Sequence, residues 1–121
     1  MLSILLIEDD EFIIDIYTQK LEKEGFSVDV AKDGQSAMAK IKEKVFDLVL
    51  LDIVLPKFDG WQILTEIKKD KRLKNTKVVI LSNLGQKSEV EKGVVLGATK
   101  YLIKANYSPS EMVKEIKKIL R

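Results

Sequence analysis

The chain has 121 residues, of which 45% are hydrophobic, so it is long enough for one domain with a buried core and short for two. Its 21 lysines and arginines against 19 acidic residues give a net charge of +2, a near balance that argues against direct nucleic-acid binding. The absence of both cysteine and histidine excludes disulfides, cysteine nucleophiles, the usual general base and the usual zinc ligands.

The chain begins with an apolar run, Ser3–Ile7, that predicts a strand. The run is too short for a signal sequence, and the acidic residues Glu8, Asp9 and Asp10 follow it at once. No apolar run in the sequence approaches the length of a membrane span. We therefore expect a cytoplasmic protein with no membrane partner.

Four more short apolar runs follow, separated by segments of helical periodicity. Runs rich in valine, isoleucine and leucine are typical of strands that are buried on both faces of a sheet. The four are Ser27–Ala31, Leu48–Leu51, residues 77–81 and Lys100–Ile103. The most polar of them is Ser27–Ala31, which we expect near an edge of the sheet.

The segments between the strands predict helices with recognisable ends. The first covers about residues 10–24 and the fourth about residues 86–96. The expected boundary residues are the N-caps Asp10, Asp33 and Asp59, the terminator Gly25, and a capping box from Ser108 to Glu111. Gly93 lowers the helical propensity of the fourth segment by about 1 kcal/mol relative to alanine, so we expect a marginal helix that is suited to movement.

Five successive βα units joined by right-handed crossovers predict a parallel sheet with helices on both faces. The length suits the strand order 2-1-3-4-5, which defines an α/β doubly wound, flavodoxin-like (βα)5 sandwich. We expect a single domain over residues 1–121. In this order the first and third strands are neighbours.

Charged and polar side chains stand at the ends of four predicted strands. Glu8 and Asp9 follow the first strand, Asp52 the third, Ser82 the fourth and Lys104 the fifth. Open α/β sheets bind their ligands at this carboxyl edge. Because crowded carboxylates repel one another, the three acids are expected to hold a hard divalent cation through oxygen ligands, with Mg²⁺ favoured.

Five separated motifs run through the whole chain. They are LLIEDD at 5–10, LLDIVLP at 50–56, DG at 59–60, ILS at 80–82 and GATKYLIK at 97–104. In this order they resemble the response-regulator receiver domain of two-component signalling, and the stand-alone chemotaxis regulators among them. No output domain follows Arg121, so we expect a receiver that acts on a separate output protein.

The resemblance implies a phosphoacceptor with slow self-catalysed phosphorylation and dephosphorylation, not an enzyme with turnover. Asp52 would accept a phosphoryl group from a histidine kinase, a histidine phosphotransfer protein or a small donor. Asp9, Asp52 and the main-chain carbonyl of Val54 would ligate Mg²⁺, while Glu8 would act mainly through water. Lys104 would neutralise charge on the phosphoryl group during its transfer.

The resemblance also implies a switch. Ser82 would hydrogen-bond the new phosphoryl group, and Tyr101 would then rotate inward. The surface formed by the fourth helix, fifth strand and fifth helix would change shape and select an output partner. Two copies of the chain can also pair through that surface.

Three departures from the family pattern stand out. Ala105 replaces the usual proline after the lysine, which leaves open whether the Lys104–Ala105 bond is cis or trans. Asn83 stands where a smaller residue is usual. Val54 and Leu84 are apolar at positions that handle the attacking water, which predicts slow autodephosphorylation.

The sequence also allows other functions. A phosphorelay intermediate would pass the group to another histidine, and a degenerate module would bind partners without phosphorylation. A phosphohydrolase would need a second acid at the position of Val54, and a nucleotide-binding module would need a glycine-rich loop after the first strand. Taken singly, Asp52, Ser82, Tyr101 and Lys104 can be turn, packing or solvated residues. The lysine-rich stretches at 68–72 and 114–118 are interpreted as solvated helix faces.

Overall fold

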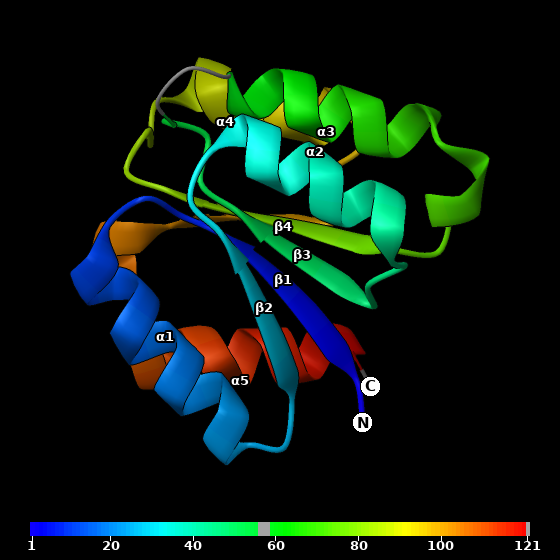
Figure 1. Cartoon of the computed structure of the whole chain (residues 1–121). Coiled ribbons are helices and arrows are strands. Elements are labelled where there is room, and N and C mark those ends of the chain that lie inside the picture. The colour runs from blue at the N-terminus through cyan, green and yellow to red at the C-terminus, as the bar shows by residue number, and fades with distance from the viewer. Residues whose placement is uncertain (56–58, 121) are drawn as a thin grey trace.

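A computed structural model describes residues 1–55 and 59–120 (Figure 1). One parallel sheet contains the strands β1 (Ser3–Ile7), β2 (Ser27–Ala31), β3 (Leu48–Leu51), β4 (Lys77–Ser82) and β5 (Lys100–Ile103). The strand order β2-β1-β3-β4-β5 confirms the predicted topology, with β2 at an edge. Pro56 of the motif around Asp52 lies outside the described residues.

The described residues form five helices, which cover the two faces of the sheet. They are α1 (Glu11–Lys23), α2 (Gly34–Glu43), α3 (Gly60–Lys69), α4 (Lys87–Val95) and α5 (Pro109–Leu120), with short 3-10 turns η1 (Lys71–Leu73) and η2 (Lys104–Asn106). Figure 1 shows α1 and α5 on one face and α2, α3 and α4 on the other. Within the described ranges, every helix is too short or too polar to cross a membrane.

Side chains of β1 divide the core into two clusters. Leu5 and Ile7 pack with α2 and α3, whereas Ile4 and Leu6 pack with α1 and α5. All four are essentially inaccessible to solvent, as expected for a strand covered on both faces. Burial of β1 and β3 in the middle of the sheet holds their carboxyl ends in place.

Hydrogen bonds at the helix ends explain where the helices begin and stop. Asp10 accepts from the backbone N–H groups of the first turn of α1, and Asp33 and Asp59 do the same for α2 and α3. Ser108 Oγ accepts from the Glu111 N–H at 3.1 Å, and Glu111 Oε1 accepts from the Ser108 N–H at 2.8 Å. These contacts confirm the predicted N-caps and the capping box. The terminator Gly25 has a φ of +92°.

The start of α3 passes very close to the backbone after β3. A Cβ atom on Gly60 would lie 2.6 Å from the Cα atom of Ile53 and 2.7 Å from its carbonyl oxygen. The Gly60 N–H donates to the same carbonyl at 3.1 Å. Because Ile53 directly follows Asp52, this approach helps to fix the backbone of the predicted phosphoacceptor.

Candidate functional site

Backbone pairing brings the predicted acids to one edge of the sheet. The Asp52 N–H donates to the Ile7 carbonyl at 3.0 Å, and the Glu8 N–H donates to the Ala31 carbonyl at 3.0 Å. The ladders therefore continue for one residue beyond β1 and β3. This extension places the side chains of Glu8 and Asp52 at neighbouring strand ends, as the strand order predicts.

The acidic cluster consists of Glu8, Asp9 and Asp52. Each offers a carboxylate oxygen, and these oxygens all lie within 4.8 Å of one another. Glu8 and Asp52 are buried, with 2% and 7% of their surface exposed, whereas Asp9 is exposed. Burial raises the pKa of Glu8, and its hydrogen bond with Lys104 lowers that pKa in part. Glu8 Oε2 also accepts from the N–H groups of Asp9 and Asp10 at 3.1 and 3.2 Å.

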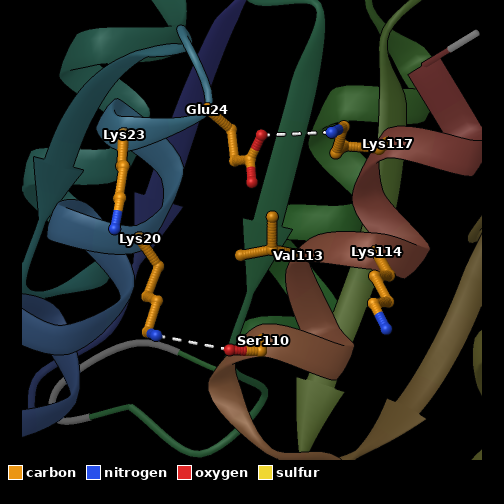
Figure 2. Close-up of a pocket in the computed structure, with 7 residues that line it drawn as sticks. All are labelled: Lys20, Lys23, Glu24, Ser110, Val113, Lys114 and Lys117. Carbon is orange, nitrogen blue, oxygen red and sulfur yellow. Dashed lines mark hydrogen bonds and ion pairs between the residues drawn. The ribbon is translucent and has the colours of Figure 1, made fainter.

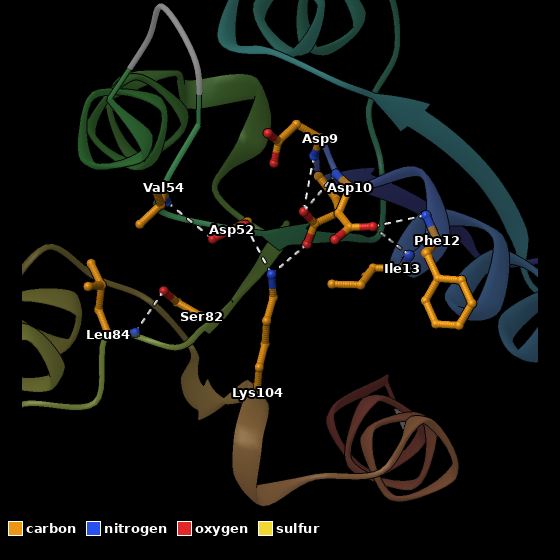
Figure 3. A network of polar contacts seen from close by, with 10 residues as sticks. Asp9, Asp10, Phe12, Ile13, Asp52, Val54, Ser82, Leu84 and Lys104 are labelled. Atoms are coloured by element: carbon orange, nitrogen blue, oxygen red, sulfur yellow. Dashed lines mark hydrogen bonds and ion pairs between the residues drawn. The ribbon is translucent and has the colours of Figure 1, made fainter.

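Lys104 reaches into the acidic cluster from the end of β5. Its Nζ lies 2.7 Å from Glu8 Oε1 and 3.0 Å from Asp52 Oδ2 (Figure 3). Burial lowers the pKa of Lys104, but the hydrogen bonds and charges of the two acids outweigh that effect and raise it. The ammonium therefore stays charged at neutral pH.

The donor set of this cluster fits a hard divalent cation. Three carboxylates and one ammonium carry a formal charge of −2, which one divalent ion would balance. Carboxylate oxygens are the ligands that Mg²⁺ prefers, and it usually keeps several waters and takes only one or two carboxylates directly. The exposed Asp9 forms the solvent side of the cluster.

A pocket of about 260 Å³ opens beside the acceptor. It is lined by Asp52, Val54, Ser82, Asn83, Leu84 and Lys104. The Val54 N–H donates to Asp52 Oδ1 at 3.1 Å, and Ser82 Oγ accepts from the Leu84 N–H at 3.1 Å (Figure 3). Val54 and Leu84 are 59% and 36% exposed, so apolar surface flanks the acceptor carboxylate.

Tyr101 connects this pocket to α4. Its hydroxyl donates to the main-chain carbonyl of Leu84, in the loop after β4. Burial raises the pKa of Tyr101, and the Ser82 hydroxyl lowers it in part, which is consistent with two neighbouring hydroxyls. A Cβ atom on Gly93 would lie 2.9 Å from a carbon of the Tyr101 ring, so the missing side chain makes room for the ring against the helix.

From the sequence, Gly93 is expected only to weaken its helix. A lone glycine inside a helical pattern also indicates close packing at that position, although it does not identify Tyr101 as the partner. Tyr17, which is buried on α1, is a second residue near the site for which the sequence indicates no functional role. Burial raises the pKa of Tyr17. The charge of Lys104 lowers this pKa in part, and the charges of Glu8 and Asp52 raise it. No local pattern separates Tyr17 from an ordinary core residue.

The structure shows whether the peptide bond after Lys104 is cis or trans. No cis peptide occurs in the described part of the chain, so the Lys104–Ala105 bond is trans. The chain continues directly into the turn η2, with the Tyr107 N–H donating to the Lys104 carbonyl at 3.3 Å.

The sequence matches the family model "Response regulator receiver domain" over residues 4–117. Regulatory protein VanRc of Enterococcus gallinarum is 37% identical over 119 residues, which cover 98% of this chain and 50% of that protein. Sensory transduction protein RegX3 of Mycolicibacterium smegmatis is 37% identical over 123 residues, which cover 100% of this chain and 51% of that protein. The chain thus spans about half the length of these relatives.

Solved structures share the whole fold. A CheY-like receiver domain protein from Methanospirillum hungatei superposes with a TM-score of 0.91 at 29% identity, covering 99% of this chain and 94% of that chain. The Mn²⁺-bound form of response regulator Rcp1 superposes with a TM-score of 0.86 at 29% identity, covering 98% of this chain and 93% of that chain.

Proposed function

Because the chain belongs to the family of response regulator receiver domains, we propose that it is a binding switch controlled by phosphorylation of Asp52. The observation that carries the proposal is the contact set of this one carboxylate. Asp52 is buried at a strand end, beside Glu8 and Asp9, and pairs with the ammonium of Lys104. A histidine kinase or a histidine phosphotransfer protein would supply the phosphoryl group.

In the proposed step, a carboxylate oxygen of Asp52 attacks the phosphorus atom. The new O–P bond forms as the bond from phosphorus to the donor nitrogen or oxygen breaks, and the leaving group keeps that electron pair. Bound Mg²⁺ would neutralise the charge that builds up on the phosphoryl oxygens. Lys104, already in contact with Asp52, would pair with one of those oxygens after transfer.

The Mg²⁺ ligands in this proposal are Asp9, Asp52 and the main-chain carbonyl of Val54, with Glu8 acting through water. The proximity of the three carboxylates supports it, and the Mn²⁺-bound structure of Rcp1 provides a precedent in a related protein.

The switch would start at Ser82. Moving its hydroxyl toward a phosphoryl oxygen would disturb its bond with the Leu84 N–H, and Leu84 is also the residue whose carbonyl anchors Tyr101. Release of Tyr101 would alter the surface of α4, β5 and α5, so a partner that prefers the new shape would shift the population. The proposed users of this surface are an output protein and a second copy of the chain.

A phosphorelay intermediate is the second candidate. The apolar residues Val54 and Leu84 beside Asp52 favour it, because slow hydrolysis preserves the phosphoryl group for transfer. Whether the output lies in a separate protein is part of the proposal, since the relatives above are about twice as long.

Incubation with Mg²⁺ and acetyl phosphate, followed by intact-mass measurement, tests the proposed function. We expect the mass of one phosphoryl group to be added. Rapid turnover of phosphoesters would instead indicate a phosphohydrolase. No adduct, with the protein folded, would indicate an interaction module without phosphorylation.

Mg²⁺ should stabilise the folded protein through Asp9. At about ten times its Kd, the ion should add about 1.4 kcal/mol to the free energy of unfolding, or roughly 5 °C in Tm. Asp9→Asn should remove most of this Mg²⁺-dependent shift in a thermal melt. Asp15→Asn, at an exposed position of α1, is the matched control and should keep it. Equal shifts in both variants would contradict the assignment of Asp9.

Autodephosphorylation should be slow in the wild type and faster in Val54→Asn/Leu84→Glu. Polar side chains at these positions would orient the attacking water, and we expect the half-life of the phosphoprotein to fall by about tenfold or more. Phosphate release after removal of the donor measures it. Val45→Asn/Leu2→Glu, which alters two exposed apolar residues elsewhere, should leave the half-life unchanged. An unchanged rate in the first variant would refute the idea.

A further inference from the structure

A groove of about 310 Å³ separates α1 from α5 (Figure 2). Its lining residues are Lys20, Lys23, Glu24, Ser110, Val113, Lys114 and Lys117. The lining therefore contains four lysines and a single acidic residue, in a chain whose net charge is only +2. None of these residues lines the pocket at Asp52.

Two polar contacts join the helices across the groove. Lys20 Nζ donates to Ser110 Oγ at 3.3 Å, and Lys117 Nζ lies 3.1 Å from Glu24 Oε2. Figure 2 shows these two pairs on opposite sides of Val113. The side chains of Lys117 and Glu24 are 48% and 43% exposed, so water weakens their attraction and a competing carboxylate can displace it.

The other two lysines add charge that nothing in the groove balances. Lys23 and Lys114 are exposed and have no hydrogen bond or ion pair with any residue in the described ranges, although the charge of Lys114 also acts on Glu111, which lies outside the groove lining. With one carboxylate against four ammonium groups, the groove carries a surplus of positive charge. The aliphatic stems of the four lysines supply apolar surface in the groove, and the core residue Val113, only 4% exposed, forms part of its floor.

The spacing of the lysines in the groove favours one class of anionic partner over the others. A free phosphate needs donors that converge on one point, whereas Lys20 and Lys117 are held on opposite sides of Val113. A nucleic acid needs a long basic surface, which the nearly neutral composition does not favour. We infer that the groove between α1 and α5 binds an acidic protein segment, with carboxylates near the lysines at both ends and an apolar side chain over Val113.

Binding in this groove should not depend on phosphorylation. Another side of α5 carries Glu115, whose Oε1 accepts from Lys100 of β5 at 2.9 Å, so that side faces the surface proposed to switch. The groove contains none of the residues that link Asp52 to Tyr101. The groove therefore suits a docking contact that holds a partner in both states, and this inference does not rest on the proposed function.

A labelled peptide with two glutamate pairs separated by one leucine tests the inference by fluorescence anisotropy. Lys23→Glu/Lys114→Glu should weaken binding by at least about tenfold, because two attractions become repulsions. Lys71→Glu/Lys74→Glu makes the same charge change at exposed positions around η1 and should stay within about twofold of the wild type. Treatment with acetyl phosphate should leave the affinity of the wild type unchanged.

Amide shifts in a two-dimensional NMR titration should map the peptide to Val113 and its neighbours in the groove. The inference would be overturned if both double variants lost the same affinity for the peptide, or if a peptide with glutamine in place of glutamate bound equally well. Amide shifts outside the groove would also overturn it. Tighter binding of a DNA duplex or of inorganic phosphate through Lys23 and Lys114 would also overturn it. Both double variants should give a normal circular dichroism spectrum, which excludes misfolding as the cause of weaker binding. Both should also be phosphorylated normally by acetyl phosphate, so a failure of the groove inference can be told apart from a failure of the proposed function.

Discussion

Asp52→Asn is expected to abolish formation of the phosphoryl adduct. Asparagine preserves the volume of the side chain and leaves Lys104 its contact with Glu8 at 2.7 Å. It removes the anionic oxygen that must attack phosphorus, so the loss of reaction should be complete while the fold persists. Intact-mass measurement after incubation with acetyl phosphate and Mg²⁺ checks the result, and circular dichroism checks the fold.

The matched control for this variant is Asp15→Asn. Asp15 is exposed on α1 and lies outside the acidic cluster, so its variant should gain one phosphoryl group as the wild type does. An adduct of equal yield on Asp52→Asn would mean that another carboxylate is the acceptor. Asp9, the exposed member of the cluster, would then be the first alternative.

Gly60→Ala is expected to cause the largest loss of stability among single-methyl additions to the described glycines. The new Cβ would lie 2.6 Å from the Cα atom and 2.7 Å from the carbonyl oxygen of Ile53, and neither backbone atom can rotate away. Overpacking of this kind costs about 3 kcal/mol. Helix propensity alone predicts the opposite sign, since alanine is favoured over glycine by roughly 0.5–1 kcal/mol. Urea unfolding measures the difference.

Gly85→Ala is the control for that experiment. Its Cβ would lie 3.1 Å from Cδ1 of Ile103, the far end of a flexible side chain, so we expect a change below about 1 kcal/mol. Because Ile53 adjoins Asp52, Gly60→Ala should also slow phosphorylation under conditions where the variant is folded. If Gly60→Ala left the stability unchanged or raised it, the start of α3 could not lie as close to the Ile53 backbone as the structure places it.

Local patterns explain why the fold was predictable. The continuous apolar composition of β1 and of the other central strands predicts a parallel sheet covered on both faces, and the polarity of Ser27–Ala31 predicts an edge strand. The helix caps follow from single residues such as Asp33, because the capping side chain bonds to a backbone group only a few positions away. Features of this kind can be predicted from a single sequence because they do not depend on tertiary contacts.

Contacts between distant segments were only partly predictable. The strand order predicts that Lys104 approaches Asp52, but the simultaneous contact with Glu8 depends on the path of the chain after β5. The contact of Gly93 with Tyr101 depends on how closely α4 packs, and no local pattern sets that distance.

The groove between α1 and α5 illustrates the same limit. Lys20 and Ser110 are 90 positions apart in the sequence, so their contact has no local signature. The stretch 114–118 was interpreted as a solvated face. Lys114, Lys117 and Lys118 are indeed exposed, but Lys117 and Lys118 also pair with Glu24 and Glu115.

The central claim is that three crowded carboxylates hold a divalent cation and so allow Asp52 to accept a phosphoryl group. A crystal structure of the protein grown with saturating Mn²⁺, with anomalous data collected at the metal edge, tests it most directly. The account predicts one anomalous peak in contact with the carboxylates of Asp9 and Asp52 and the carbonyl of Val54. Carboxylates turned away from one another, with no peak between them, would contradict it.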